Sequence, residues 1–122
     1  HMRETTIFEK IVAGEIPCNK VLENDHFLAF HDINPKAPIH ILIIPKVHVR
    51  NFHEVSAETM AAMTLFIQKV AEFMGMEKGG YRLITNNGDD GGQEVHHLHF
   101  HLLGGTKLKW PHLADADPKN AL

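Results

Sequence analysis

The sequence predicts a single α+β domain in which helices pack on an antiparallel sheet. Its predicted elements occur as a helix, several strands, a long helix and more strands, without the regular alternation of a parallel α/β fold. Short, hairpin-like spacings separate strands at both ends of the chain, which favours antiparallel pairing. The length of 122 residues fits one domain with a core that needs no disulfides.

The first half of the chain combines one short helix with three strands. The helix is expected over about residues 7–13, with Thr5 or Thr6 as its N-cap and Gly14 at its end. Its apolar stripe indicates packing against the core. The strands are expected over residues 21–23, 26–31 and 39–44, with a turn at 24–25 and a proline-containing loop at 34–38.

The second half begins with a long helix. Ser56 is the expected N-cap, the helix continues to about Met74, and Gly75 suits its end. Its methionines fall on the apolar stripe and are interpreted as core residues rather than ligands. A strand over 81–85 and a glycine-rich loop over 86–92 then lead into a histidine-containing strand that Gly104-Gly105 closes.

The histidine strand carries the densest group of reactive side chains. His97, His99 and His101 alternate with Leu98, Phe100 and Leu102. Period-two alternation predicts that the imidazoles share one strand face, with neighbours about 6.6–6.8 Å apart along the strand. The apolar residues would fill the opposite face, toward the core.

Three interpretations of this strand stay open from the residues alone: a metal site, a catalytic strand with one nucleophilic imidazole, and a hydrogen-bonded structural network. The spread of about 13 Å over the three positions disfavours a single ion held by all of them. His40, alone in an apolar run, is either a core histidine or a partner that fixes the tautomer of a catalytic imidazole. Asp32 is either a turn-former or an acceptor for ligand hydroxyls. The loop glycines Gly91-Gly92 would either make a plain turn or allow a phosphate to approach the backbone.

Composition excludes several classes of protein. The net charge is −3 with neutral histidines, and no basic stripe suits a nucleic-acid backbone. Cys18 is the single cysteine, so a reducing, cytoplasmic setting without an internal disulfide is expected. No apolar run approaches the ~20 residues of a membrane helix. His1-Met2 is interpreted as a vector scar and initiator methionine, followed by a domain over 3–110 and a C-terminal tail over 111–122.

Several separated motifs, taken together, resemble a known family. The run Gln93-Glu94-Val95-His96-His97-Leu98-His99-Phe100-His101-Leu102-Leu103-Gly104-Gly105 resembles the signature of the histidine triad (HIT) superfamily. The segments Phe30-His31-Asp32-Ile33-Asn34-Pro35 and Ile43-Ile44-Pro45-Lys46-x-His48, with Trp110-Pro111, are similar to its Hint branch, the purine nucleoside phosphoramidases. The resemblance extends from Ile7-Phe8 to Trp110.

The resemblance implies a five-stranded antiparallel sheet with two helices, and a homodimer whose sheets join into one of ten strands. It also implies hydrolysis of the P–N bond of adenosine or guanosine 5′-phosphoramidates through a nucleotidyl-histidine intermediate, without a metal or other cofactor. Purine nucleoside monophosphates would be ligands. Competing functions are a dinucleotide polyphosphate hydrolase or nucleotidyltransferase, a nucleotide-binding scaffold with incidental catalysis, and a metal-dependent hydrolase.

By the same resemblance, His99 would be the nucleophile, His101 would contact the phosphate oxygens, His97 would order the site and His40 would hydrogen-bond within the triad. Asp32 would bind the ribose hydroxyls, beside Ile33. The base pocket would be lined by Ile7, Phe8, Ile11, Phe30 and Leu42. The phosphate and leaving group would be surrounded by Asn86, Gly92, Gln93 and Val95. Trp110 would reach toward the partner subunit's site.

Two positions depart from the animal relatives. Glu94 stands near the leaving-group nitrogen where animal relatives carry a serine and bacterial relatives often a glutamate. A carboxylate there is expected to disfavour anionic leaving groups. His96 replaces a common tyrosine and is expected to point away from the triad face.

Overall fold

The computed structural model describes residues 3–115, so the interpreted scar at 1–2 and the end of the tail at 116–122 lie outside the described residues. The elements within that range are α1 (Ile7–Val12), β1 (Lys20–Glu23), β2 (Phe27–His31), β3 (Ile39–Pro45), α2 (Ala57–Phe73), β4 (Arg82–Ile84) and β5 (Phe100–Gly104). The five strands that this part of the chain contains form one antiparallel sheet, ordered β1-β2-β3-β5-β4. The predicted α+β class, with two helices on a five-stranded sheet, is confirmed.

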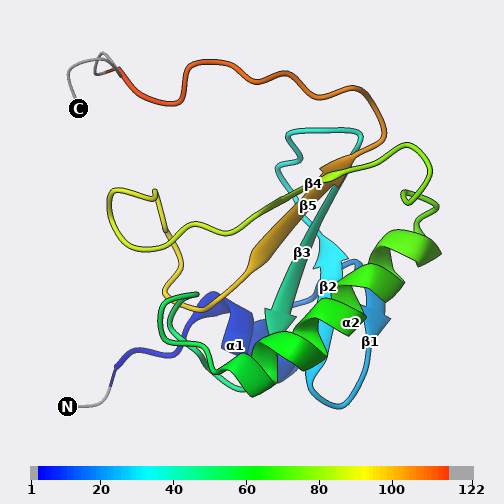
Figure 1. Cartoon of the computed structure of the whole chain (residues 1–122). Helices are drawn as coiled ribbons and strands as arrows, with labels where there is room; N and C mark the ends of the chain where they lie inside the picture. Colours follow the sequence, from blue (N-terminus) through cyan, green and yellow to red (C-terminus); the bar gives the residue numbers. More distant parts are fainter. Residues whose placement is uncertain (1–2, 116–122) are drawn as a thin grey trace.

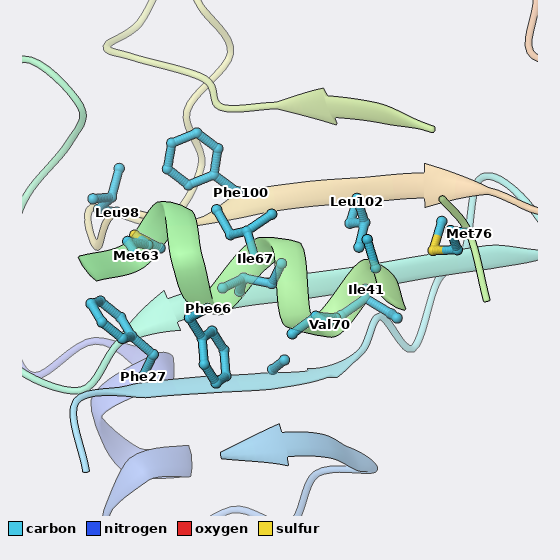
Figure 2. Close-up of a cluster of buried hydrophobic side chains, with 13 residues drawn as sticks. Phe27, Ile41, Met63, Phe66, Ile67, Val70, Met76, Leu98, Phe100 and Leu102 are labelled. Atoms are coloured by element: carbon cyan, nitrogen blue, oxygen red, sulfur yellow. The ribbon is translucent and has the colours of Figure 1, made fainter. Parts of the chain in front are cut away.

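Helix α2 covers one face of the sheet and closes the larger core (Figure 1). Ser56 caps it by accepting a hydrogen bond from the backbone N–H of Thr59, as expected. Met63, Ile67 and Val70 of the predicted stripe are buried. Figure 2 shows these side chains in one buried cluster with Ile41 and Leu102 of the central strands. Among residues 3–115, no helix combines the length and the apolar character needed to cross a membrane.

The opposite face of the sheet carries α1 and a smaller cluster. Phe8 of α1 packs there with side chains of β2 and β3, namely Leu28, Phe30, Leu42 and Ile44. His40 belongs to this face by alternation with Leu42. In the β3–β5 ladder, Leu42 lies opposite His101. The chemistry predicted for the histidine strand therefore lies on the side of α1, away from α2.

The expectation of one regular strand carrying all three histidines is wrong. β5 begins only at Phe100, so His101 alone of the triad lies in the ladder, and residues 95–97 form a bend. Before Phe100 the backbone makes other bonds: the N–H of Leu98 donates to the carbonyl of Val49, and the hydroxyl of Thr85 donates to the carbonyl of His99. These partners replace the ladder, which explains why β4 and β5 are shorter than predicted.

The predicted alternation still separates polar from apolar residues. Leu98, Phe100 and Leu102 are buried in the core under α2. The rings of His99 and His101 lie 5.2 Å apart between centroids, on the other side.

Candidate active site

His99 is held as a buried imidazole with one ring nitrogen assigned. Its Nδ1 lies 2.7 Å from the carbonyl oxygen of His97, and its side chain is buried. A carbonyl oxygen only accepts, so Nδ1 carries the hydrogen and donates it. In the neutral ring the Nε2 atom then keeps its lone pair. His99 is therefore presented as a neutral imidazole with a nucleophilic Nε2.

His97 is fixed at both ring nitrogens. Its Nε2–H donates to the carbonyl of Pro45 at 2.8 Å, and its Nδ1 lies 3.0 Å from the hydroxyl of Thr6. The side chain is fully buried. Phe8 packs edge-on against the rings of both His97 and His99, at 5.7 and 4.9 Å between centroids. α1 thus supports the two histidines from one side.

His40 and His101 form a second pair in which the backbone sets the protons. The backbone N–H of Lys36 donates to Nδ1 of His40 at 3.0 Å, so a neutral His40 carries its hydrogen on Nε2. That Nε2 lies 2.9 Å from Nδ1 of His101. His101 accepts there and, when neutral, carries its own hydrogen on Nε2. His101 therefore offers an N–H donor on a ring whose centroid lies 5.2 Å from that of His99.

Burial keeps these four imidazoles neutral. Desolvation is the main cause that lowers the pKa of His40, His97 and His99 below the ordinary value of 6.5. The pKa of His101 falls to about 4, chiefly through burial and then through the neighbouring His99 and His40. A neutral ring is what a nucleophile requires, so the site suits nucleophilic attack at neutral pH.

Within residues 3–115, one set of side chains has a composition that could hold a metal ion. Asp32, His40 and His101 each offer a ligand atom, and these atoms lie within 4.8 Å of one another. The hydrogen bonds oppose that use. To bind an ion through Nε2, a neutral His40 would have to move its hydrogen to Nδ1, where the N–H of Lys36 already points. The set is better explained as a proton-ordered network than as a metal site.

The expected base-pocket residues divide into two groups. Phe8, Phe30 and Leu42 are buried together, and Ile11 packs partly buried against them with Val95. Ile7, on the first turn of α1, is instead 48% exposed. The structure therefore brings together an apolar wall beside the triad, and Ile7 is not part of it.

Asp32 stabilises a turn, which is one of the two roles that the sequence left open for it. One carboxylate oxygen accepts the N–H of Asn34 at 2.8 Å, and the other lies 3.4 Å from Nε2 of His40. Because His40 is neutral, the second contact is a weak polar one rather than an ion pair. The carboxylate keeps lone pairs for a ligand, and the neighbouring Ile33 is 90% exposed.

The glycine-rich loop is held together from within. A side chain at Gly91 would meet the backbone of Asn87 at 2.6 Å, and Gly92 has a φ of +78°. The side chain of Gln93 accepts the N–H of Gly88 and donates to the carbonyls of Arg50 and Val95. The glycines and Gln93 therefore shape the loop itself, and a ligand would meet mainly backbone here. Asn86 is the first residue of this loop, two positions after the end of β4.

Two expected site residues, Glu94 and Trp110, lie outside the histidine cluster. Glu94 is exposed and lines a groove of about 450 Å³ that Thr6 and Val95 border. Trp110 is 74% exposed and packs under the guanidinium of Arg82, which also donates to the carbonyl of Lys109. Within one chain Trp110 thus packs against Arg82 of β4.

Sequence reasoning missed three partners of the histidines: the hydroxyl of Thr6, the carbonyl of Pro45 and the N–H of Lys36. The sequence predicted Thr6 only as one of two possible N-caps, beside Thr5. Two of the three groups belong to the backbone. Every residue carries such groups, so a pattern of side chains does not identify them. The third partner is 91 positions from the histidine it contacts.

Comparison with known proteins gives consistent matches over most of the chain. Residues 13–108 match the family model of the HIT domain. A HIT-like protein of Helicobacter pylori (strain ATCC 700392 / 26695) is 55% identical over 101 residues, which cover 83% of this chain and 97% of that protein. The purine nucleoside phosphoramidase of Escherichia coli (strain K12) is 48% identical over 110 residues, covering 88% and 92%.

A solved structure agrees with these sequence matches. The crystal structure of a HIT family hydrolase from Legionella pneumophila Philadelphia 1 superposes with a TM-score of 0.83 at 44% identity, covering 88% of this chain and 98% of that one. Sequence and architecture therefore point to the same group of proteins.

Proposed function

We propose that this chain, which belongs to the HIT domain family, is a nucleoside phosphoramidase that cleaves the P–N bond of purine nucleoside 5′-phosphoramidates. The name of the Escherichia coli relative supports this substrate class. The observation that carries the proposal is the hydrogen bond from Nδ1 of His99 to the carbonyl of His97. It leaves Nε2 of a neutral imidazole free to attack phosphorus.

The proposed reaction has two displacement steps. In the first, Nε2 of His99 forms a bond to the α-phosphorus and the P–N bond breaks, and the leaving nitrogen takes a proton from solvent and departs as an amine. In the second, water attacks the same phosphorus and returns a proton to solvent, and the bond to His99 breaks, which releases the nucleoside monophosphate. The Nε2–H of His101 is a donor for the phosphate oxygens, where negative charge accumulates.

The nucleotide would lie along the α1 face of the sheet. The apolar wall of Phe8, Phe30 and Leu42 suits a purine, and the carboxylate of Asp32 suits a pair of ribose hydroxyls. No step of this mechanism is assigned to a metal ion, because the histidines and backbone N–H groups supply the donors.

The reaction class is tested by intact-protein mass spectrometry after rapid mixing with an adenosine 5′-phosphoramidate. We expect a transient nucleotidyl adduct on the wild type and none on His99→Ala, whose turnover should be abolished. A His99→Ala variant that keeps most of its activity would show that the nucleophile is another residue. A higher kcat/KM for a diadenosine polyphosphate than for the phosphoramidate would instead assign the enzyme to the dinucleotide polyphosphate hydrolases.

We further propose that two copies pair through the β4 edge. β4 is an edge strand, and its Leu83 is 42% exposed. On α2, Leu65 and Phe73 are 64% and 66% exposed, which is high for large apolar side chains on a packed helix. Edge-to-edge pairing would satisfy the free backbone groups of β4 and extend the sheet.

Sedimentation equilibrium tests this pairing. The wild type should sediment as a dimer, and Leu83→Lys should shift it toward monomer by placing a charge in the pairing surface. Val47→Lys is the control, because Val47 is 77% exposed on the loop after β3. A monomeric wild type would contradict the proposed pairing.

A further inference from the structure

The N-cap of α1 reaches the histidine cluster. The hydroxyl oxygen of Thr6 lies 3.0 Å from Nδ1 of His97. The same oxygen accepts the backbone N–H of Glu9 at 3.1 Å, and the N–H of Thr6 donates to the carboxylate of Glu9 at 2.9 Å. This reciprocal pair is a capping box, which holds Thr6 in place at the helix start. Arg3 binds the same carboxylate from outside.

The direction of each hydrogen bond around His97 is determined. The carbonyl of Pro45 can only accept, so Nε2 of His97 donates to it. A neutral His97 then has a lone pair on Nδ1. Since the oxygen of Thr6 already accepts from Glu9, its single hydrogen is free to be donated to that lone pair. Thr6 is the side-chain donor that the ring of His97 requires.

The position of His97 in turn affects His99. His97 is 0% exposed, and its ring is anchored to Pro45 on one side and to Thr6 on the other. Its carbonyl is the group that accepts the Nδ1–H of His99. A shift or rotation of His97 would move this acceptor, and the ring of His99 would lose the contact that sets its tautomer and its orientation.

We propose that Thr6 is a positioning residue for the nucleophile, acting through His97 on His99. This inference rests on the proposed function, because it takes His99 as the attacking group. It assigns to the start of α1 a role beyond capping: the hydroxyl of Thr6 orders a ring 91 positions away, and that ring's own carbonyl aims the nucleophile.

Three substitutions at one position separate donation from capping. Thr6→Ser keeps both the cap and the donor. Thr6→Asp keeps a strong cap but offers only acceptors to Nδ1, and Thr6→Val keeps the shape but has neither function. We expect Thr6→Ser to stay near wild-type kcat and the other two to lose about 10- to 100-fold, as a misplaced reactive group does. Glu9→Ala is the control that loosens the capping box without touching the hydroxyl.

The pattern among these variants decides the proposal. If Thr6→Val loses activity but Thr6→Asp keeps it, capping alone matters. A loss in Glu9→Ala as large as the loss in Thr6→Val would lead to the same conclusion. Activity lost in Thr6→Asp but kept in Thr6→Val would assign the effect to the added charge. Either result, or no loss in both variants, would overturn the role of Thr6 as a donor.

Nitrogen NMR of the histidine rings provides a readout that a loosened helix would not change. In the wild type and in Thr6→Ser, His97 should show a hydrogen-bonded, unprotonated Nδ1, and His99 a protonated Nδ1 with an unprotonated Nε2. In Thr6→Val the His99 signals should become a mixture of tautomers, and unchanged signals would refute the proposal. If the wild type cleaves no phosphoramidate, the proposed function fails, while these spectra still decide whether Thr6 orders His97 and His99.

Discussion

Backbone groups that can only accept or only donate assign the protons of His40, His97 and His99. The side chain of His40 then assigns those of His101. The carbonyls of Pro45 and His97 can only accept, and the N–H of Lys36 can only donate. Each therefore fixes one ring nitrogen, and the neutral ring fixes the other. As a result, a lone pair on His99 and an N–H on His101 are both present before any ligand arrives. Preorganised groups of this kind cost no rearrangement during the reaction.

Removing the donor to His101 should therefore slow the chemical step. In His40→Ala, Nδ1 of His101 loses the Nε2–H that lies 2.9 Å away, so His101 can carry its hydrogen on either nitrogen. We expect the rate of adduct formation in rapid-quench experiments to fall at least about ten-fold, within the range for a lost general acid–base contact. His26→Ala is the control, since His26 is an exposed histidine outside this network. An unchanged rate in His40→Ala would show that His101 does not depend on His40.

Glu94 should influence which leaving groups are accepted. Its exposed carboxylate lines the groove bordered by Thr6 and Val95, so it would repel a leaving amine that carries a carboxylate. We expect Glu94→Gln to raise kcat/KM for such a substrate about two- to five-fold, as an exposed charge pair would, and to leave a neutral amine unchanged. The measurement is a competition between two adenosine phosphoramidates that differ only in that distal group. An equal change in kcat/KM for both substrates would show that Glu94 does not select the leaving group.

At the scale of elements, periodicity predicted the type of each element better than its extent. The alternation around the triad placed Leu98, Phe100 and Leu102 in the core, and all of them are buried there. It did not reveal that β5 starts at Phe100. The ladder ends because Thr85 and Val49 provide the partners for the backbone of 98–99, and those contacts depend on the tertiary fold. The roles assigned to individual site residues came from family resemblance and stay predictions.

The loop before the triad gives a prediction at the same scale. In Gly91→Ala the new Cβ would lie 2.6 Å from the carbonyl oxygen and 2.8 Å from the nitrogen of Asn87, so the loop must shift. We expect the free energy of unfolding, from urea titration, to fall by about 1–3 kcal/mol, as overpacking does. Gly79→Ala is the matched control, because nothing lies within 4 Å of its Cβ. Similar free energies of unfolding for the two variants would show that the loop at Gly91 has room for a side chain.

The whole molecule divides its two sheet faces between stability and chemistry. The face under α2 is a closed apolar core, and the face under α1 combines apolar packing with three buried imidazoles and the half-buried ring of His101. The sequence predicted this division, since apolar and histidine positions alternate. It could not predict how far burial lowers the histidine pKa values, because that depends on Phe8 and other distant residues that cover the rings.

The same burial makes folding stability depend on pH. In the unfolded chain the histidines bind protons near pH 6.5, whereas in the folded protein His40, His97, His99 and His101 have lowered pKa values. Below pH 6.5 the unfolded state therefore binds more protons, and the free energy of unfolding falls as pH falls. For His101, whose folded pKa is about 4, the loss continues to about that pH. It is at most about 3 kcal/mol, because solvent screens the half-buried ring.

Urea titrations between pH 7 and 4.5 measure this loss of unfolding free energy separately from the effect of carboxylate protonation. The lowered pKa values of Glu9 and Glu23, which are about 2, stabilise the fold above pH 4.5 and lose that effect only below it. The histidines should thus account for the slope between pH 6.5 and 4.5. His101→Asn, which keeps a polar side chain but does not titrate, should flatten that slope. A wild-type stability that is constant over this range would mean that the buried imidazoles accept protons without unfolding, and the site would then be more accessible to water than its packing indicates.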